Sequence, residues 1–161
     1  MKVTRSMINK DLRFVGFFRK MLIHNPTVAK FKLVNHIDAM SIGKKLNGFQ
    51  CDTVHITGRD GVTDIRVRLY RRAKQYRSDS KPVPGVLCLH GGGFVSGYPE
   101  STHFSIRRIL SQQDCVVVNP DYRRSLDAPY PAAVHDCYDT LEWMVNNHLS
   151  LGIRSDQIFL Y

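Results

Sequence analysis

The chain has 161 residues, of which 43% are hydrophobic and 23% are charged, and its formal net charge at pH 7 is +9. A chain of this length is expected to form one domain, and the composition is ordinary for a soluble globular protein. It contains no internal repeat, no low-complexity tract and no apolar run near the ~18 residues of a membrane span, which excludes repeat, low-complexity and transmembrane classes.

The positive charge is concentrated at the N-terminus. Residues 1–50 contain ten Lys or Arg and two acidic residues, a net charge of +8, whereas residues 51–161 contain thirteen basic and twelve acidic residues, a net charge of +1. A basic segment can bind nucleic acid or anionic lipid. No nucleic-acid-binding module accompanies it, so we interpret it as a solvated helix surface and expect no nucleic-acid partner.

Cysteine and histidine usage predicts neither a metal site nor a disulfide framework. The four cysteines lie far apart and form no CxxC pair. His135 and Cys137 are two residues apart on a predicted helix and therefore face different ways, and no other pair has ligand spacing. The N-terminus has no secretory signal pattern, so we expect a reduced, cytoplasmic protein.

Two amphipathic helices are predicted within residues 1–50. The first covers about residues 5–23, with apolar side chains at spacings of three and four, and the second covers about residues 28–46. Residues 51–56 and 62–70 alternate in polarity around a glycine-containing turn, which predicts a β-hairpin with one exposed face.

The later elements alternate between strand and helix. Buried strands are predicted at residues 85–89 and 116–118, a helix at 101–113, a second helix from Pro131 to near Leu151, and a final strand at 157–161. The order helices, β, β, β, α, β, α, β indicates an α/β fold with an antiparallel start and a parallel continuation. Asp136 and Asp139, three residues apart on the second of these helices, are assigned to a solvated face.

The most informative motif is His90-Gly91-Gly92-Gly93-Phe94, directly after the first buried strand. Glycine reaches backbone conformations that other residues avoid and leaves its amide accessible. Backbone N–H groups presented in this way can stabilise the oxyanion of a tetrahedral intermediate. An HGGG-type motif after the third strand has this role in lipases and esterases.

Three further segments extend this pattern. They are Asp121-Tyr122-Arg123 after Asn119-Pro120, Tyr130-Pro131-Ala132-Ala133-Val134 at the start of a helix, and the terminal strand 154–161. In this order and spacing, residues 84–161 resemble the N-terminal half of an α/β-hydrolase of the hormone-sensitive-lipase-like carboxylesterase family. One departure is Arg124-Ser125-Leu126-Asp127, where the family commonly has Leu-Ala-Pro-Glu.

The resemblance implies a serine carboxylesterase or lipase-like hydrolase of short-chain esters, with no cofactor and no metal ion. Residues 1–50 would form basic N-terminal cap helices, and residues 51–161 the first half of the hydrolase core. Gly91 and Gly92 would supply the oxyanion donors. The residues implied as loop support are His90, Gly93, Asp121 and Tyr122. Phe94 and Tyr98 would line the substrate pocket, although core packing is an equal alternative for both.

No residue of the chain is expected to act as the nucleophile. In the family, the strand ending at Tyr161 leads into the nucleophile elbow, so the nucleophile, acid and base would all lie beyond it. Ser96 lacks the glycine two positions earlier that an elbow requires. We therefore expect a hydrolase fold truncated after the fifth strand, inactive alone, that self-associates or binds a completing chain. The alternatives are a non-catalytic fragment and a basic interaction module acting through residues 1–50.

Overall fold

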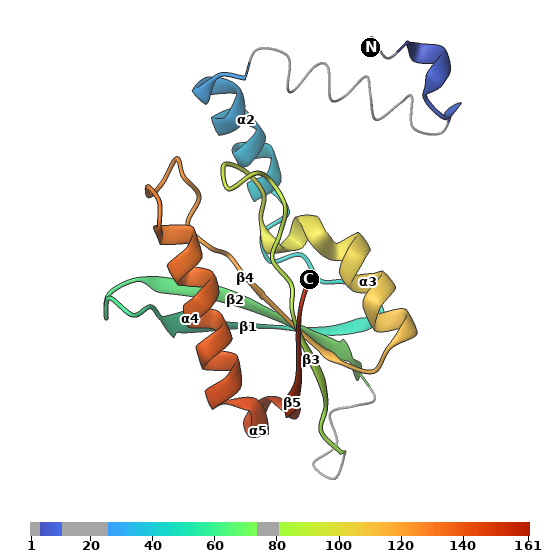
Figure 1. The fold of residues 1–161 in the computed structure, drawn as a ribbon, viewed down its shortest axis with the longest axis vertical. Helices are drawn as coiled ribbons and strands as arrows, with labels where there is room; N and C mark the ends of the chain where they lie inside the picture. The colour runs from blue at the N-terminus through green and yellow to red at the C-terminus, as the bar shows by residue number, and fades with distance from the viewer. Residues whose placement is uncertain (1–3, 11–25, 74–80) are drawn as a thin grey trace.

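The computed structural model describes residues 4–10, 26–73 and 81–161 (Figure 1). The first predicted helix, over residues 5–23, lies mostly outside these residues. At its start the structure has a short 3-10 helix, η1 (Arg5–Met7).

The second predicted helix is α2 (Val28–Ala39), and it ends earlier than the predicted boundary near Leu46. It begins at Thr27, whose hydroxyl caps the first turn by accepting a backbone N–H at 3.3 Å. After the helix, the N–H of Gly43 donates to the carboxylate of Glu100 at 2.9 Å. This bond attaches the segment after α2 to the body of the fold.

Five strands form one mixed sheet. In spatial order they are β1 (Phe49–Thr57), β2 (Asp64–Arg72), β4 (Val116–Pro120), β3 (Val83–Leu87) and β5 (Ile153–Leu160). β1 and β2 form an antiparallel hairpin and β2 is antiparallel to β4, whereas β3 is parallel to both β4 and β5. The predicted α/β fold, with its antiparallel start and parallel continuation, is confirmed.

Helices cover both faces of the sheet (Figure 1). On one face lies α3 (His103–Gln112), which follows the 3-10 helix η4 (Pro99–Thr102), and on the other lies α4 (Ala132–Asn146). The short helix α5 (His148–Leu151) leads into β5. Among the residues described, no helix has the length and apolar character needed to cross a membrane.

Successive side chains of β4 point to opposite faces of the sheet and contribute to two separate hydrophobic cores. Val116 and Val118 belong to the core under α4, which also contains Met144, whereas Val117 belongs to the core under α3 with Ile106. Every residue of β4 is buried. The run of three valines in this strand is therefore required by coverage on both faces, and the one polar side chain, Asn119, donates to the Pro99 carbonyl at 3.2 Å.

The expectation that the β1–β2 hairpin has one exposed face is wrong for β2. The side chains of Arg66 and Arg68, on the face opposite the apolar residues, are only 16% and 5% exposed. Both guanidinium groups lie against Glu100, whose side chain is fully buried. β2 is a central strand, and the ion pairs allow its charged face to be covered.

Gly85 allows α4 to lie close to β3. A Cβ atom at this position would lie 2.3 Å from Cε of Met144 and 2.8 Å from Cγ2 of Ile153. These separations are shorter than van der Waals contact, so the absence of a side chain at Gly85 sets the spacing between helix and strand.

We expect Gly85→Ala to lower the free energy of unfolding by about 1–3 kcal/mol, because the added methyl group overpacks the core. Urea denaturation followed by the fluorescence of Trp143, the single tryptophan, measures the change. Since Met144 provides the nearest atom, Gly85→Ala combined with Met144→Ala should cost less than the sum of the two single changes. Strictly additive costs would show that the methyl group does not meet Met144.

Candidate functional site

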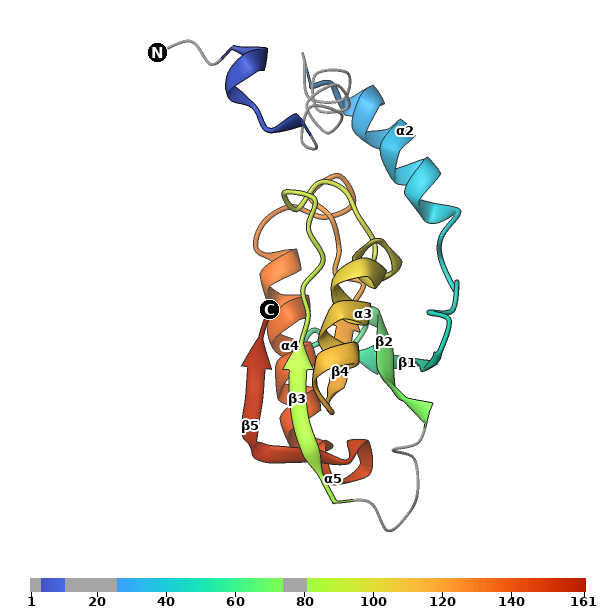
Figure 2. The ribbon, with the colours of Figure 1, turned by 90° about the vertical axis from the view of Figure 1, so that its right-hand side faces the viewer.

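Two loops lie side by side at the carboxyl ends of β3 and β4 (Figures 1 and 2). Residues 90–97 are termed the glycine loop and residues 121–131 the second loop. The backbone N–H of Ser125 donates to the carbonyl of Phe94 at 2.7 Å, which joins the loops directly. In open α/β sheets, ligands bind outside the carboxyl ends of the strands, so these loops form the candidate site.

Gly92 determines the curl of the glycine loop. Its carbonyl accepts the N–H groups of Val95 at 3.2 Å and Ser96 at 3.1 Å, and its φ is +135°. A Cβ atom on Gly92 would lie 1.7 Å from the Ser96 carbonyl oxygen. Only glycine fits at this position, both for its backbone angle and for the space available.

The amide groups of Gly91, Gly92 and Gly93 face away from the interior of the loop. The carbonyls of residues 90, 91 and 92 all accept hydrogen bonds from within the site. A trans peptide group directs its N–H opposite to its carbonyl, so the following N–H groups point away from those donors. Across residues 4–10, 26–73 and 81–161, none of the three N–H groups has an acceptor.

His90 and Tyr122 form the support of the glycine loop. Their rings are stacked, with centroids 4.0 Å apart and planes 6° apart, and the Tyr122 hydroxyl donates to the His90 carbonyl at 2.6 Å. Nδ1 of His90 lies 3.1 Å from the Gly91 carbonyl and therefore carries the proton of that bond. Burial lowers the pKa of His90 and raises the pKa of Tyr122 to about 12, so both side chains are uncharged near neutral pH.

Glu100 lies at the centre of a buried ion-pair network. Its two carboxylate oxygens accept a bidentate pair of hydrogen bonds from Arg66, at 2.7 and 3.0 Å, and Nε of Arg68 lies 3.4 Å away. Burial alone would raise the pKa of Glu100, but the bonds from Arg66 and from the Gly43 N–H outweigh it, and the pKa is lowered. Glu100 is therefore ionised near neutral pH.

Asp121 and Arg124 extend this network to both loops. Arg66 also donates to Asp121, at 2.9 and 3.0 Å, and Arg124 donates to Asp121 at 3.3 Å and to the Gly97 carbonyl at 3.2 Å. The guanidinium of Arg124 lies over the ring of Tyr98, 4.2 Å from its centroid. Arg124 is the first residue at which this chain departs from the family pattern, and here it connects the second loop to the glycine loop.

The assignment of Asp136 and Asp139 to a solvated face is wrong, because both are buried, at 1% and 8% exposed. Asp136 accepts the backbone N–H of Arg123 at 2.8 Å and its guanidinium at 2.7 Å, which fixes the second loop. Asp139 accepts the backbone N–H of Arg59 at 2.8 Å and its Nε at 2.6 Å. The partners come from distant segments, which the helical spacing could not reveal.

α2 contacts the glycine loop through Asn35. The side-chain amide of Asn35 donates to the Val95 carbonyl at 2.9 Å. Burial raises the pKa of Asp38, three residues along the helix, and nearby His90 opposes this shift. The segment before the sheet therefore lies against the candidate site.

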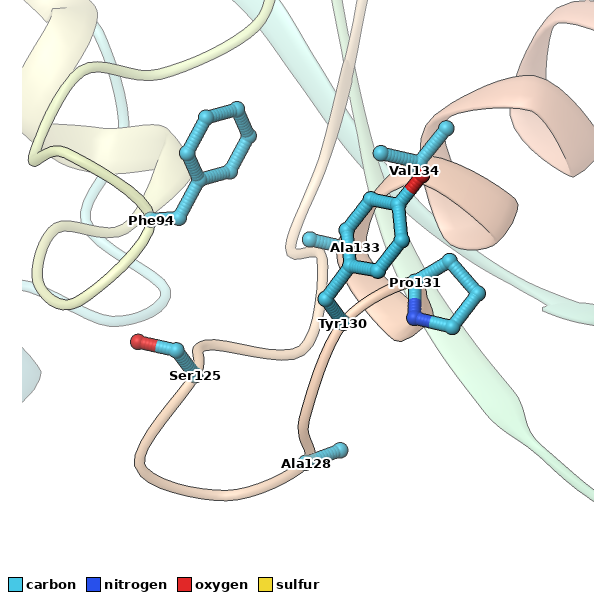
Figure 3. Close-up of a pocket in the computed structure, with 7 residues that line it drawn as sticks. All are labelled: Phe94, Ser125, Ala128, Tyr130, Pro131, Ala133 and Val134. Atoms are coloured by element: carbon cyan, nitrogen blue, oxygen red, sulfur yellow. The ribbon is translucent and has the colours of Figure 1, made fainter.

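An apolar pocket of about 200 Å³ lies between the two loops (Figure 3). Phe94 of the glycine loop forms one side of it. The other lining residues belong to the second loop and the start of α4: Ser125, Ala128, Tyr130, Pro131, Ala133 and Val134. Tyr98, the other candidate pocket residue, does not line this pocket and is buried beneath Arg124.

The side chains that hold the two loops together could not be predicted from motifs or spacing. These are Asn35, Arg66, Glu100 and Arg124. A lone glutamate directly after Tyr98-Pro99 is the one available signal, since an acidic residue between apolar elements requires a cationic partner. Among the described residues, no three His, Cys, Asp or Glu side chains are grouped so that they could hold a metal ion.

Comparison with known proteins gives consistent matches. Residues 86–161 match a family model described as the alpha/beta hydrolase fold. An arylesterase of Saccharolobus solfataricus is 33% identical over 96 residues, covering 59% of this chain and 29% of the arylesterase. Carboxylesterase NlhH of Mycobacterium tuberculosis is 38% identical over 96 residues, covering 59% of this chain and 28% of the relative. The solved structure of a hyperthermophilic esterase from Pyrobaculum calidifontis is 29% identical with a TM-score of 0.64, covering 89% of this chain and 47% of that chain.

The mixed sheet covered by helices on both faces, together with these matches, assigns the chain to the α/β-hydrolase fold. Residues 86–161 carry the family match and the curated relatives are named esterases, which agrees with the resemblance of residues 84–161 to hormone-sensitive-lipase-like carboxylesterases. The chain spans less than a third of the length of these curated relatives and about half the length of the solved chain.

We expect Glu100→Ala to lower the free energy of unfolding by about 3–5 kcal/mol, because it removes a buried carboxylate that Arg66 and Arg68 share, and leaves only Asp121 to pair with Arg66. Chemical denaturation at neutral pH measures the loss. Glu142→Ala is the matched control: its side chain is 56% exposed and 3.9 Å from Arg59, so its ion pair contributes about 0–1 kcal/mol. Similar losses in the two variants would contradict the central place of Glu100.

Proposed function

We propose that this chain supplies the oxyanion-binding part of a serine carboxylesterase that hydrolyses short-chain esters. The N–H groups of Gly91 and Gly92 would hold the oxygen that becomes negatively charged in the tetrahedral intermediate. Donors about 2.7–3.1 Å from that oxygen stabilise the transition state more than the ground state. The residues that would keep these donors in place are His90, Gly93, Asp121 and Tyr122.

The observation that carries this proposal is the orientation of the glycine amides. The carbonyls before them are engaged by the Tyr122 hydroxyl, by His90 Nδ1 and by the turn at residues 95–96. The N–H groups are thereby fixed in direction before any ligand binds, and the space next to Gly91 is open, with no heavy atom within 4 Å of the position of a Cβ. Preorganised donors of this kind need no rearrangement during the reaction.

The nucleophile, base and acid would come from polypeptide outside residues 1–161. No serine of the chain stands in a Gly-x-Ser-x-Gly elbow. The Ser96 hydroxyl donates to the Gly92 carbonyl at 3.2 Å and is part of the loop's own bonding. β5 lies next to β3, so an elbow directly after β5 would place its serine beside the glycine amides.

Residues 1–50 would form a cap beside this site in a cytoplasmic enzyme that needs no cofactor or metal ion. The bond from Asn35 to the Val95 carbonyl supports this placement for α2. The names of the matched relatives, arylesterase and carboxylesterase, support an ester as the substrate.

Residues 1–161 alone should show no ester hydrolysis above background, because loss of a serine nucleophile costs about 10⁶ in kcat. A serine-reactive fluorophosphonate probe, followed by intact-mass analysis, tests this directly. The same probe should label one serine in a chimera in which residues 86–161 replace the matching segment of the Saccharolobus arylesterase. Stoichiometric labelling of a residue within 1–161 would refute this division of the active site.

In that chimera, Gly92→Ala should lower kcat by about 10²–10³, as expected for loss of one oxyanion donor. The added methyl group cannot fit beside the Ser96 carbonyl, so the loop must shift and carry its N–H groups with it. Hydrolysis of a short p-nitrophenyl ester measures the change.

Gly152→Ala is the matched control for this variant. Gly152 also has a positive φ, +68°, but lies at the end of α5 with open space around it. The chimera with Gly152→Ala should lose some stability and keep its kcat. A loss of less than about threefold in folded Gly92→Ala would contradict the assignment.

A further inference from the structure

Helix α2 has an apolar stripe on the side that faces solvent. Leu33, Ile37 and Met40 follow one another at spacings of four and three, so they lie on one side of the helix, termed here the outer face of α2. The three residues are 60%, 56% and 72% exposed. Figure 2 shows no described element on the side of α2 that is turned away from the loops. An apolar helix face of this kind is expected to lie against another surface.

The opposite side of α2 lies against the body of the fold. Asn35 on this side donates to the Val95 carbonyl at 2.9 Å. Its neighbours on the same side, Phe31, Val34 and Asp38, are partly buried. The helix is therefore apolar on two sides, and contacts within the described chain account for only one of them.

The charge beside the outer face of α2 is positive. Residues 26–48 contain four lysines and one acidic residue, Asp38. Lys32, Lys44 and Lys45 are exposed, whereas Asp38 is partly buried on the side that faces the glycine loop. No carboxylate of residues 26–48 therefore offsets the lysines at the outer face. A surface that complements this face must be both apolar and negatively charged.

An anionic lipid surface meets both requirements. A helix with lysines beside an apolar stripe lies in the plane of a bilayer, where the stripe is buried below the headgroups and the lysines remain among the phosphates. A nucleic acid would pair with the lysines but leave the apolar stripe in water. A second copy of the chain would cover the stripe but bring two segments of like charge together.

We propose that the outer face of α2 binds the surface of an anionic lipid bilayer. The helix lies in the plane of that surface, with its apolar stripe among the acyl chains and with Lys32, Lys44 and Lys45 at the lipid phosphates. The glycine loop, bonded to the opposite side of α2, is then about one helix diameter, 10–12 Å, from the lipid. This binding involves no step of ester hydrolysis and can be measured without turnover.

Flotation of residues 1–161 with lipid vesicles tests the proposal. In a density gradient, protein bound to vesicles rises, whereas free or aggregated protein does not. The chain should rise with vesicles of phosphatidylglycerol and phosphatidylcholine in equal parts, and should stay below with vesicles of phosphatidylcholine alone. Added salt should weaken the binding, because it screens the attraction between lysines and phosphates.

A first pair of variants tests the lysines. Lys44→Gln combined with Lys45→Gln should weaken binding to the anionic vesicles about 30-fold, since each lysine near such a surface contributes about fivefold. Lys81→Gln combined with Arg108→Gln is the matched control, because it removes the same charge from exposed positions outside α2. Its affinity should change less than about threefold, since charges far from the contact are screened.

A second pair of variants tests the apolar stripe. Leu33→Gln combined with Ile37→Gln should weaken binding at least about tenfold, because two side chains that enter the bilayer become polar. Glutamine is a good helix former, so α2 should be retained. Phe104→Gln combined with Leu149→Gln is the matched control, because these residues of α3 and α5 are also exposed, at 80% and 78%. Its affinity should match the wild type.

Equal flotation with the two kinds of vesicle, or full affinity in both α2 variants, would overturn the proposal. Absence of flotation together with a dimer that light scattering detects, and that Leu33→Gln with Ile37→Gln abolishes, would assign the face to a second copy of the chain. Absence of flotation together with duplex DNA binding that only the lysine changes abolish would assign it to nucleic acid. Each of these measurements is made without an ester, so the activity of the chimera neither supports nor contradicts the lipid contact.

Discussion

The carboxylate of Glu100 joins parts of the molecule that are far apart in the sequence. It accepts hydrogen bonds from Arg66 on β2 and from the backbone of Gly43 after α2. A buried charge is tolerated only when its partners replace the water it has lost, so each of these groups constrains the others. Because Arg66 also bonds to Asp121, the position of the second loop depends on the same interaction. The geometry of the candidate site is thus determined from inside the fold as well as by the loops themselves.

The order and class of the elements could be predicted because the relevant signals are local. The run of three valines in β4 and the alternating polarity of β1 each indicate the environment of the strand from its own residues. The burial of Arg66 could not be predicted in this way, because its neighbours in sequence resemble those of an exposed strand face. Its partner Glu100 is 34 residues away. The same reason explains the error at Asp136, whose partner Arg123 lies outside the helix, in the preceding loop.

At the site, the sequence was most informative at positions where the backbone conformation allows only one type of residue. Gly92 must be glycine, so the motif identifies the loop directly. The contacts that orient this loop depend on which elements meet in space, and Asn35 is a case in point. Nothing in residues 28–39 indicates that one amide on an exposed helix reaches the Val95 carbonyl. The candidate pocket could not be predicted from the sequence either. Phe94 and Val134 line it together because β3 and β4 are neighbours in the sheet.

Arg124 restricts the relative orientation of the glycine loop and the second loop. A leucine at this position, as is common in the family, would hold the loops by contact alone, and apolar contact tolerates rotation and sliding. The planar guanidinium of Arg124 instead lies over Tyr98 while its N–H groups point at Gly97 and Asp121. Fewer relative orientations of the loops remain available. The conformational entropy of bringing them together is consequently lost when the chain folds, and a ligand that binds between them does not have to offset it.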